Sequence, residues 1–204
     1  MLRVQPERIL VPSSHNKHPS RLRSGSGRPS TGRLTSPAQE RRVVLRGRLT
    51  RLIASCCIAR LVVLAAEDQQ EPIIMYIDSP GGSASEAMGI LSTMNGVRCP
   101  VLTFCRGQVA GPAAVIAAHG LAGYRVAAAS ARFSLRLSSF GSAADAELDS
   151  LLSLLTDGLS KDARHAPEEV TEWLRNGADF SAQEALRRGI IDTIAEAPAF
   201  PKPA

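Results

Sequence analysis

Lysine and histidine are scarce in this sequence. Arginine supplies most of the 24 basic side chains, and the three lysines are Lys17, Lys161 and Lys202. A serine nucleophile needs a neighbouring base that accepts its proton, and histidine or lysine usually supplies it. No lysine falls between residues 18 and 160, so we expect no serine–lysine dyad in the middle of the chain.

Other features missing from the sequence exclude further classes of function. No run of about 18 apolar residues is present, so we expect no membrane-spanning helix. The chain has no Walker-type glycine loop, so nothing in the sequence suggests that it binds ATP. No cluster of potential ligands has the spacing of a metal site. No cofactor is therefore expected. The cysteines form no zinc-type CxxC pair, and we interpret them as reduced core residues of a cytoplasmic protein. They are Cys56, Cys57, Cys99 and Cys105.

The positive charge is concentrated at the amino terminus. The chain carries a net +5; residues 1–37 hold seven basic side chains and one acidic one, Glu7, which gives +6 and leaves −1 for residues 38–204. The Ser-, Pro-, Gly- and Arg-rich composition favours a disordered leader, with an early assigned start codon as one explanation. An organelle transit peptide and a tail for an anionic partner are the alternatives. No aromatic residue interleaves the basic ones, so nucleic acid is not favoured as a partner.

Residues 72–115 form the central pattern of the chain. Two short apolar runs rich in β-branched residues each lead into a glycine turn and then into a helical segment. This order is typical of buried parallel strands with helical crossovers and predicts an α/β fold. Open α/β sheets usually bind ligands at the carboxyl ends of such strands. The predicted strands are 73–77 and 101–105, the turns 78–82 and 106–112, and the helices 84–94 and 113–119.

The segments on either side complete one domain. A helix is predicted over 52–66, where apolar residues repeat with helical spacing. Ser181 and Glu184 have the spacing of a capping box, which begins another helix. We divide the chain into a leader (1–37), one domain (38–196) and a loose tail (197–204). The remaining predicted elements are strands at 43–45, 124–127, 131–137 and 190–194, a leucine-striped helix within 143–159, and a helix that begins at 166–169.

The two glycine turns read Asp78-Ser79-Pro80-Gly81-Gly82 and Cys105-Arg106-Gly107-Gln108-Val109-Ala110. In these residues the chain closely resembles the proteolytic subunit of the ATP-dependent Clp protease, a serine peptidase. The likeness continues, in order, from residue 41 to residue 194. It implies a crotonase-like α/β fold of repeated β-β-α units, with a parallel sheet and a helical handle.

The resemblance also implies partners. Members of the family form oligomeric rings, so we expect a homo- or hetero-oligomeric ring of Clp-type proteolytic subunits. ATP would be used by a partner AAA+ ATPase and not by this chain, and peptides would be the substrates. In the family the handle stacks two rings. The interval from Arg136 to Gly177 is 177 − 136 = 41 residues, shorter than the family's, so the handle looks short.

The family's nucleophile and oxyanion positions are altered. The resemblance places the catalytic serine at Gly111, which has no side chain. The next residue donates an oxyanion N–H in the family, and here it is Pro112, which has none. The other donor, the N–H of Gly82 beside Gly81, is retained. Loss of one oxyanion donor costs about 10²–10³ in rate even in an intact site.

The base and the residue that orients it are altered as well. The family's histidine falls on Arg136, whose guanidinium stays protonated and is no general base near neutrality. The family's aspartate falls on Gly177. A small gap would bring in Asp179 instead, which we interpret as a surface or capping residue.

No other set of residues replaces this triad. His119 lies eight residues beyond Gly111, about 12 Å along a helix, where it would cap the helix end. His15, His18 and His165 lie in the leader or after the predicted handle. The serines near strand ends, which lack a base, are Ser79, Ser83, Ser85, Ser134, Ser138 and Ser139.

Three functions remain open. The first is a catalytically degenerate Clp-type subunit that acts as a structural or regulatory ring member beside active paralogues. The second is a working ATP-dependent serine endopeptidase with atypical residues. The third is a crotonase-like protein that binds an acyl thioester through paired N–H groups. The turn at 79–82 either holds an extended peptide by main-chain hydrogen bonds or only maintains the fold.

Overall fold

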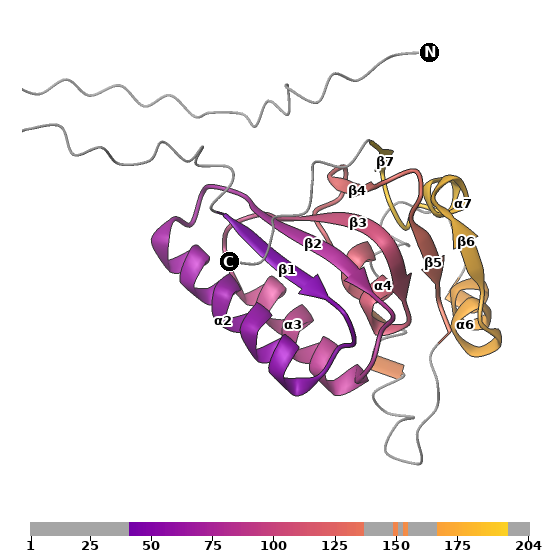
Figure 1. Cartoon of the computed structure of the whole chain (residues 1–204), viewed down its shortest axis with the longest axis horizontal. Helices are drawn as coiled ribbons and strands as arrows, with labels where there is room; N and C mark the ends of the chain where they lie inside the picture. The colour runs from indigo at the N-terminus through magenta and orange to yellow at the C-terminus, as the bar shows by residue number, and fades with distance from the viewer. Residues whose placement is uncertain (1–40, 137–148, 151–152, 155–166, 196–204) are drawn as a thin grey trace, which may run out of the picture. The chain divides into compact units, whose positions relative to one another are not determined.

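A largely parallel sheet forms the centre of the domain (Figure 1). The computed structural model describes residues 41–136, 149–150, 153–154 and 167–195. Five strands lie side by side and parallel in the order β1-β2-β3-β4-β7. Their bounds are Arg42–Arg46 for β1, Ile73–Ser79 for β2, Val101–Ala110 for β3, Arg125–Ala127 for β4 and Thr193–Ile194 for β7.

Two further strands extend the sheet beside β3. The strand β5 (Arg132–Ser134) pairs in parallel with the last residues of β3, and β6 (Asp179–Ser181) pairs antiparallel with β5. A kink in β3 makes this branch, because its first half pairs with β4 and its last three residues pair with β5. Gly107 lies at the kink with a φ of 63°, and the Asp78 carboxylate accepts a hydrogen bond from the Gln108 N–H there at 3.2 Å.

Three helices cover one face of the sheet, behind the strands in Figure 1. They are α2 (Arg51–Glu67), α3 (Ala84–Gly96) and α4 (Pro112–Ala118). The core lies between them and the sheet, where Leu45, Met75 and Ile77 are fully buried. Thr50 caps α2 and Ser83 caps α3 through side-chain oxygens, which satisfy amides at the first turn.

The opposite face of the sheet carries a separate apolar row. Val44, Tyr76, Phe104 and Val126 lie in register across the four strands β1 to β4. The rings of Tyr76 and Phe104 are 5.6 Å apart and tilted by 44°, a favourable aromatic geometry. Because side chains alternate along each strand, this row is separate from the core under the helices.

The carboxyl-terminal part packs as a short unit of α6 (Pro167–Asn176), β6 and α7 (Ala182–Arg187). The predicted capping box at the start of α7 is confirmed: Ser181 Oγ accepts from the Glu184 N–H at 3.3 Å, and the Glu184 carboxylate accepts from the Ser181 N–H at 2.8 Å. The Ser181 N–H and the Ser181 hydroxyl both donate to the Glu184 carboxylate, and these two hydrogen bonds lower the pKa of Glu184.

A buried ion pair links Arg125 of β4 to Asp192, near the carboxyl end of the domain. Arg125 is 1% exposed, and its Nε and Nη2 donate to the two carboxylate oxygens of Asp192 at 2.8 and 2.6 Å. The backbone N–H groups of Gly123 and Arg125 also donate to this carboxylate. Burial by itself would raise the pKa of Asp192, but the hydrogen bonds and charge of Arg125 outweigh burial and the pKa is lowered.

The structure corrects several predicted elements. The region 106–112 is strand as far as Ala110, because it pairs with β5. The strand predicted at 190–194 shortens to β7, since the N–H groups of Ile190 and Ile191 donate to the Ala185 carbonyl at the end of α7. The strand predicted at 131–137 is limited to β5 within the described residues. Cys56 is exposed rather than in the core, whereas the other three cysteines are buried.

Some predictions fall outside the described residues. These are the leader (1–37), the tail (197–204) and most of the leucine-striped helix, of which residues 149–150 and 153–154 are described and helical. The short handle therefore stays a prediction. In the described part of the chain, no helix combines the length and the apolar character needed to cross a membrane.

Candidate functional site

The two glycine turns meet at the carboxyl ends of β2 and β3. Gly81 has a φ of 85°, and a Cβ there would lie 2.6 Å from the Ala110 carbonyl oxygen and 3.4 Å from Pro112 Cδ. A Cβ on Gly82 would clash with the Leu49 backbone. Glycine is thus required at both positions, because three backbone segments approach one another closely there.

Gly111 forms the sharp turn between β3 and α4. Its φ of 51° and ψ of −126° lie outside the regions that side chains favour. Its N–H donates to the Ser134 carbonyl at 2.7 Å, which fixes the turn against β5. Strand-to-helix turns of this kind present the nucleophile in α/β-hydrolases. Here the apex of the turn has no side chain to present.

Pro112 is the first residue of α4 and is buried. Proline suits this position because the first helical N–H would have no partner within the helix. It also removes the N–H that would point out of the helix start beside Gly111. The N–H of Gly82 remains, and no acceptor is assigned to it among the described residues. The turn therefore offers one backbone donor where an oxyanion hole needs two.

Arg136 and Gly177 lie in contact. The resemblance implies this contact, because it places the family's histidine at residue 136 and its aspartate at residue 177. A Cβ on Gly177 would lie 2.6 Å from Arg136 Nε and 3.1 Å from its Cζ. The guanidinium thus lies directly over the bare backbone of Gly177, which has a φ of 73°. Arg136 follows Ser134 by two residues, so it belongs to the same corner as Gly111.

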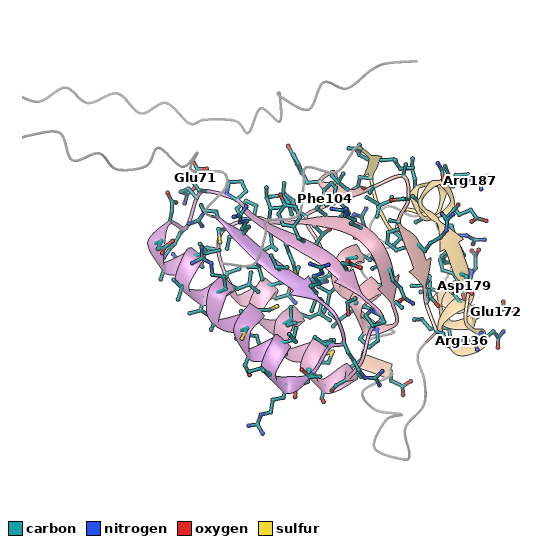
Figure 2. The ribbon with its side chains drawn as sticks, in the orientation of Figure 1. Glu71, Phe104, Arg136, Glu172, Asp179 and Arg187 are labelled. Atoms are coloured by element: carbon teal, nitrogen blue, oxygen red, sulfur yellow. The ribbon has the colours of Figure 1, made fainter. Side chains whose placement is uncertain are left out.

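Asp179 takes a different place from Gly177. It is exposed and lies in β6, opposite Ser134 of β5. Figure 2 shows Arg136 and Asp179 at the same edge of the domain, beside α6. In the described part of the chain, no ion pair joins the two side chains. Asp179 is therefore a surface residue of the β5–β6 edge, two residues along the chain from Gly177.

The other nucleophiles near the turns have structural contacts. Ser79 is fully buried, and its Oγ accepts from the Gly81 N–H at 3.1 Å. Ser83 caps α3 and is hydrogen-bonded to Ser85 at 2.9 Å. Burial raises the pKa of the Cys105 thiol strongly, so this thiol stays protonated and is a poor nucleophile.

Among the described residues, no base lies at the turns either. His119 is the one histidine among the described residues, and it lies at the far end of α4. Its Nε2 is 2.8 Å from Asn95 Oδ1 on α3. The helix-capping position predicted from the sequence is thereby confirmed. In the described residues no group of three potential metal ligands gathers either.

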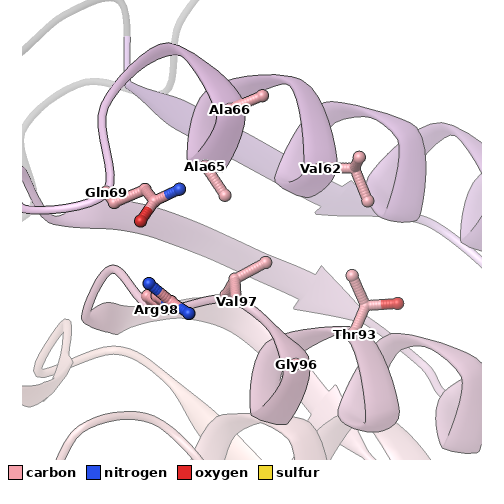
Figure 3. Close-up of a pocket in the computed structure, with 8 residues that line it drawn as sticks. All are labelled: Val62, Ala65, Ala66, Gln69, Thr93, Gly96, Val97 and Arg98. Atoms are coloured by element: carbon pink, nitrogen blue, oxygen red, sulfur yellow. The ribbon is translucent and has the colours of Figure 1, made fainter.

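A groove that the sequence did not reveal lies between α2 and α3 (Figure 3). It has a volume of about 580 Å³ and lies where both helices end, near the amino ends of β2 and β3. It is therefore at the opposite edge of the sheet from the glycine turns. Its lining residues are Val62, Ala65, Ala66, Gln69, Thr93, Gly96, Val97 and Arg98.

The fold and the two turns define a class: an α/β protein built like serine peptidases of the crotonase-like fold, with glycine at the apex of its nucleophile turn. Comparison with known proteins agrees. The family model for Clp protease matches residues 31–198. The proteolytic subunit 1 of the ATP-dependent Clp protease of Corynebacterium efficiens is 33% identical over 194 residues, which cover 90% of this chain and 93% of that protein. The chain belongs to the Clp protease family.

Proposed function

We propose that this chain is a catalytically inactive Clp-type proteolytic subunit that serves as a structural or regulatory member of an oligomeric ring in ATP-dependent protein degradation. Gly111 is the observation that carries the proposal. The turn that would present the nucleophile is intact, with its N–H fixed to Ser134, but glycine offers no atom that attacks a carbonyl.

Two further features support the loss of hydrolysis. Pro112 cannot donate to an oxyanion, and Arg136 lies where the resemblance puts the base. Neither change unfolds the corner, because Pro112 begins α4 and Arg136 packs on Gly177. The frame of a peptidase site is therefore kept without its reactive groups, which favours a role in assembly over a role in chemistry. ATP would be used by a partner ATPase, and this chain would need no cofactor.

Exposed apolar side chains support membership of a ring. Val62 and Val63 on α2 are 52% and 48% exposed, and Val62 also lines the groove between α2 and α3. A second subunit or the ATPase that covers this surface would remove apolar area from water, which is the main favourable term in most protein association.

The test mixes the purified chain with an active Clp proteolytic subunit from the same cell and follows cleavage of a fluorogenic peptide. We expect the chain to co-purify with that subunit and to change its turnover, and a fluorophosphonate to label the active subunit alone. Labelling of this chain, lost on substitution of a single serine, would establish the atypical endopeptidase instead. Tight binding of a coenzyme A thioester by the chain alone would favour the crotonase-like alternative.

A further inference from the structure

Arg136 is a cation at the corner that holds the empty nucleophile turn. Its side chain is exposed. Within the described ranges, no carboxylate is assigned to it as an ion-pair or hydrogen-bond partner. Instead, its Nε, Nη2 and Cζ would lie 2.6, 3.0 and 3.1 Å from a Cβ on Gly177. The absence of a side chain at residue 177 is what lets the guanidinium lie there.

The backbone around Arg136 places it beside the glycine turns. Gly111 is hydrogen-bonded to Ser134, two residues before Arg136. On its other side, the same β3–α4 turn contacts Gly81 through Ala110 and Pro112. A backbone N–H donor at Gly82 and a guanidinium at Arg136 therefore flank one turn. Neither Gly111 nor Gly177 adds a side chain between them.

We propose that this corner binds an extended peptide and that Arg136 pairs with a carboxylate of that peptide. A guanidinium presents a planar fork of N–H donors that matches a carboxylate, and it is charged at every physiological pH. The turn at 79–82 supplies the main-chain contacts, and Arg136 supplies a preference for acidic sequences. This inference rests on the proposed function, since the peptide is held and not cut.

Two acidic residues oppose the preference. Asp179 is exposed in β6, opposite Ser134, and Glu172 is exposed on the neighbouring α6. Their charges lie at the same edge as Arg136 (Figure 2) and reduce the attraction for an anionic peptide, more strongly at low salt. Removal of the charge at Asp179 should therefore strengthen the binding of an acidic peptide.

The experiment measures the affinity of the full chain for four fluorescein-labelled octapeptides by anisotropy at low and physiological salt. The peptides carry either Glu or Gln at a central position and end in either a free carboxylate or an amide. We expect at least one carboxylate, internal or terminal, to tighten binding by up to about fivefold, the upper end of the range for an exposed ion pair. The two peptide ends tell which carboxylate is bound.

Variants assign the effect to Arg136. Arg136→Gln should remove the preference for a peptide carboxylate, and Arg136→Lys should retain part of this preference. Arg132→Gln is the matched control, since Arg132 is an exposed arginine at the start of β5, four residues before Arg136, and it should keep the preference. Gly177→Asp should abolish the preference by pairing internally with Arg136. Gly177→Asn, of the same shape without the charge, should reduce it less.

The outcomes separate this inference from the proposed function. Equal affinity for all four peptides, no binding of any of them, or a preference that survives Arg136→Gln would overturn the inference while leaving an inactive ring member intact. Cleavage of the peptides by the unmodified chain would overturn the proposed function itself. Circular dichroism of each variant confirms that it is folded before its affinity is compared.

Discussion

Residue 111, where the resemblance to the Clp proteolytic subunit implies a serine, is a glycine, and its backbone conformation favours glycine. A positive φ of 51° with a ψ of −126° strains any residue that carries a Cβ. An active enzyme accepts this strain in order to present its nucleophile. In the inactive subunit proposed above, glycine at this position avoids the strain.

Gly111→Ser should therefore cost stability and give no activity. We expect a loss of about 1–3 kcal/mol in the free energy of unfolding, the usual cost of a strained backbone position. Hydrolysis should stay undetectable, because no base lies beside the new hydroxyl in the described part of the chain. Urea unfolding and a fluorogenic peptide assay measure the two effects. Rapid hydrolysis by this single variant would show that a base had been missed.

Restoration of all the altered positions should show what Pro112 contributes. The variant with Gly111→Ser, Arg136→His and Gly177→Asp regains the three side chains of a triad, but one oxyanion donor is still absent. Adding Pro112→Ala restores that N–H and should raise the rate by about 10²–10³. Equal rates for the triple and quadruple variants would mean that Pro112 has no role in the loss of activity.

At the scale of elements, the sequence predicted the order of strands and helices well because periodic burial decides it. The helix at 52–66 became α2, and its apolar repeat faces the sheet. The sequence could not predict that β3 continues through residues 106–110, because that depends on pairing with β5, about 25 residues further on. It also missed β6, a three-residue strand that exists only by pairing with β5.

The candidate site, like the fold, could be predicted only in part from the sequence. The sequence motif around residues 111 and 112 was sufficient to predict that Gly111 and Pro112 occupy the family's nucleophile and oxyanion positions. The contact between Arg136 and Gly177 was implied by the resemblance, but that the guanidinium lies on the glycine backbone is visible only in three dimensions. The groove between α2 and α3 had one signal in the sequence, the valines Val62 and Val63 outside the buried face of α2.

Asp192→Asn should strongly destabilise the domain, because it leaves the buried guanidinium of Arg125 without its counter-charge. We expect a loss of about 3 kcal/mol in the free energy of unfolding, at the low end for a broken buried pair because Asp192 is partly exposed. Asp179→Asn, at an exposed carboxylate, is the control and should change stability by less than about 0.5 kcal/mol. Urea unfolding at pH 7 compares the two.

The same pair predicts a pH dependence. The pKa of Asp192 is lower in the folded chain than in the unfolded chain, so the contribution of the pair is complete above about pH 4, where the unfolded carboxyl is ionised. It is lost as the pH falls below that value. The difference in stability between the unmodified chain and Asp192→Asn should shrink between about pH 4 and pH 2. A difference that is constant over this range would contradict the assignment.

At the scale of the whole molecule, the glycine turns and the groove lie at opposite edges of the sheet. At the first edge, the positions that the resemblance assigns to the nucleophile and the base hold Gly111 and Arg136. The second edge carries the groove between α2 and α3, which Val62 lines together with Thr93 and Arg98. Under the proposed function, the first edge does no chemistry and the second edge takes part in assembly with other subunits.

Val62→Asp should weaken co-assembly with an active Clp proteolytic subunit. A charge in the groove would have to be desolvated when the surface is covered, which is unfavourable without a partner. Leu121→Asp is the control, because Leu121 is similarly exposed at 42% but lies in the loop after α4. Analytical size exclusion of the mixed subunits measures the fraction in rings. Equal assembly of both variants would exclude the groove from the interface.

We expect this chain to lack peptidase activity of its own. The most direct test is the turnover of a fluorogenic peptide by the purified chain alone, with an active Clp proteolytic subunit as the positive control in the same assay. The structure predicts no turnover above the uncatalysed rate, at any concentration and with or without a partner ATPase. Turnover that persists through purification and is abolished by a single substitution within this chain would show that the chain is an active peptidase.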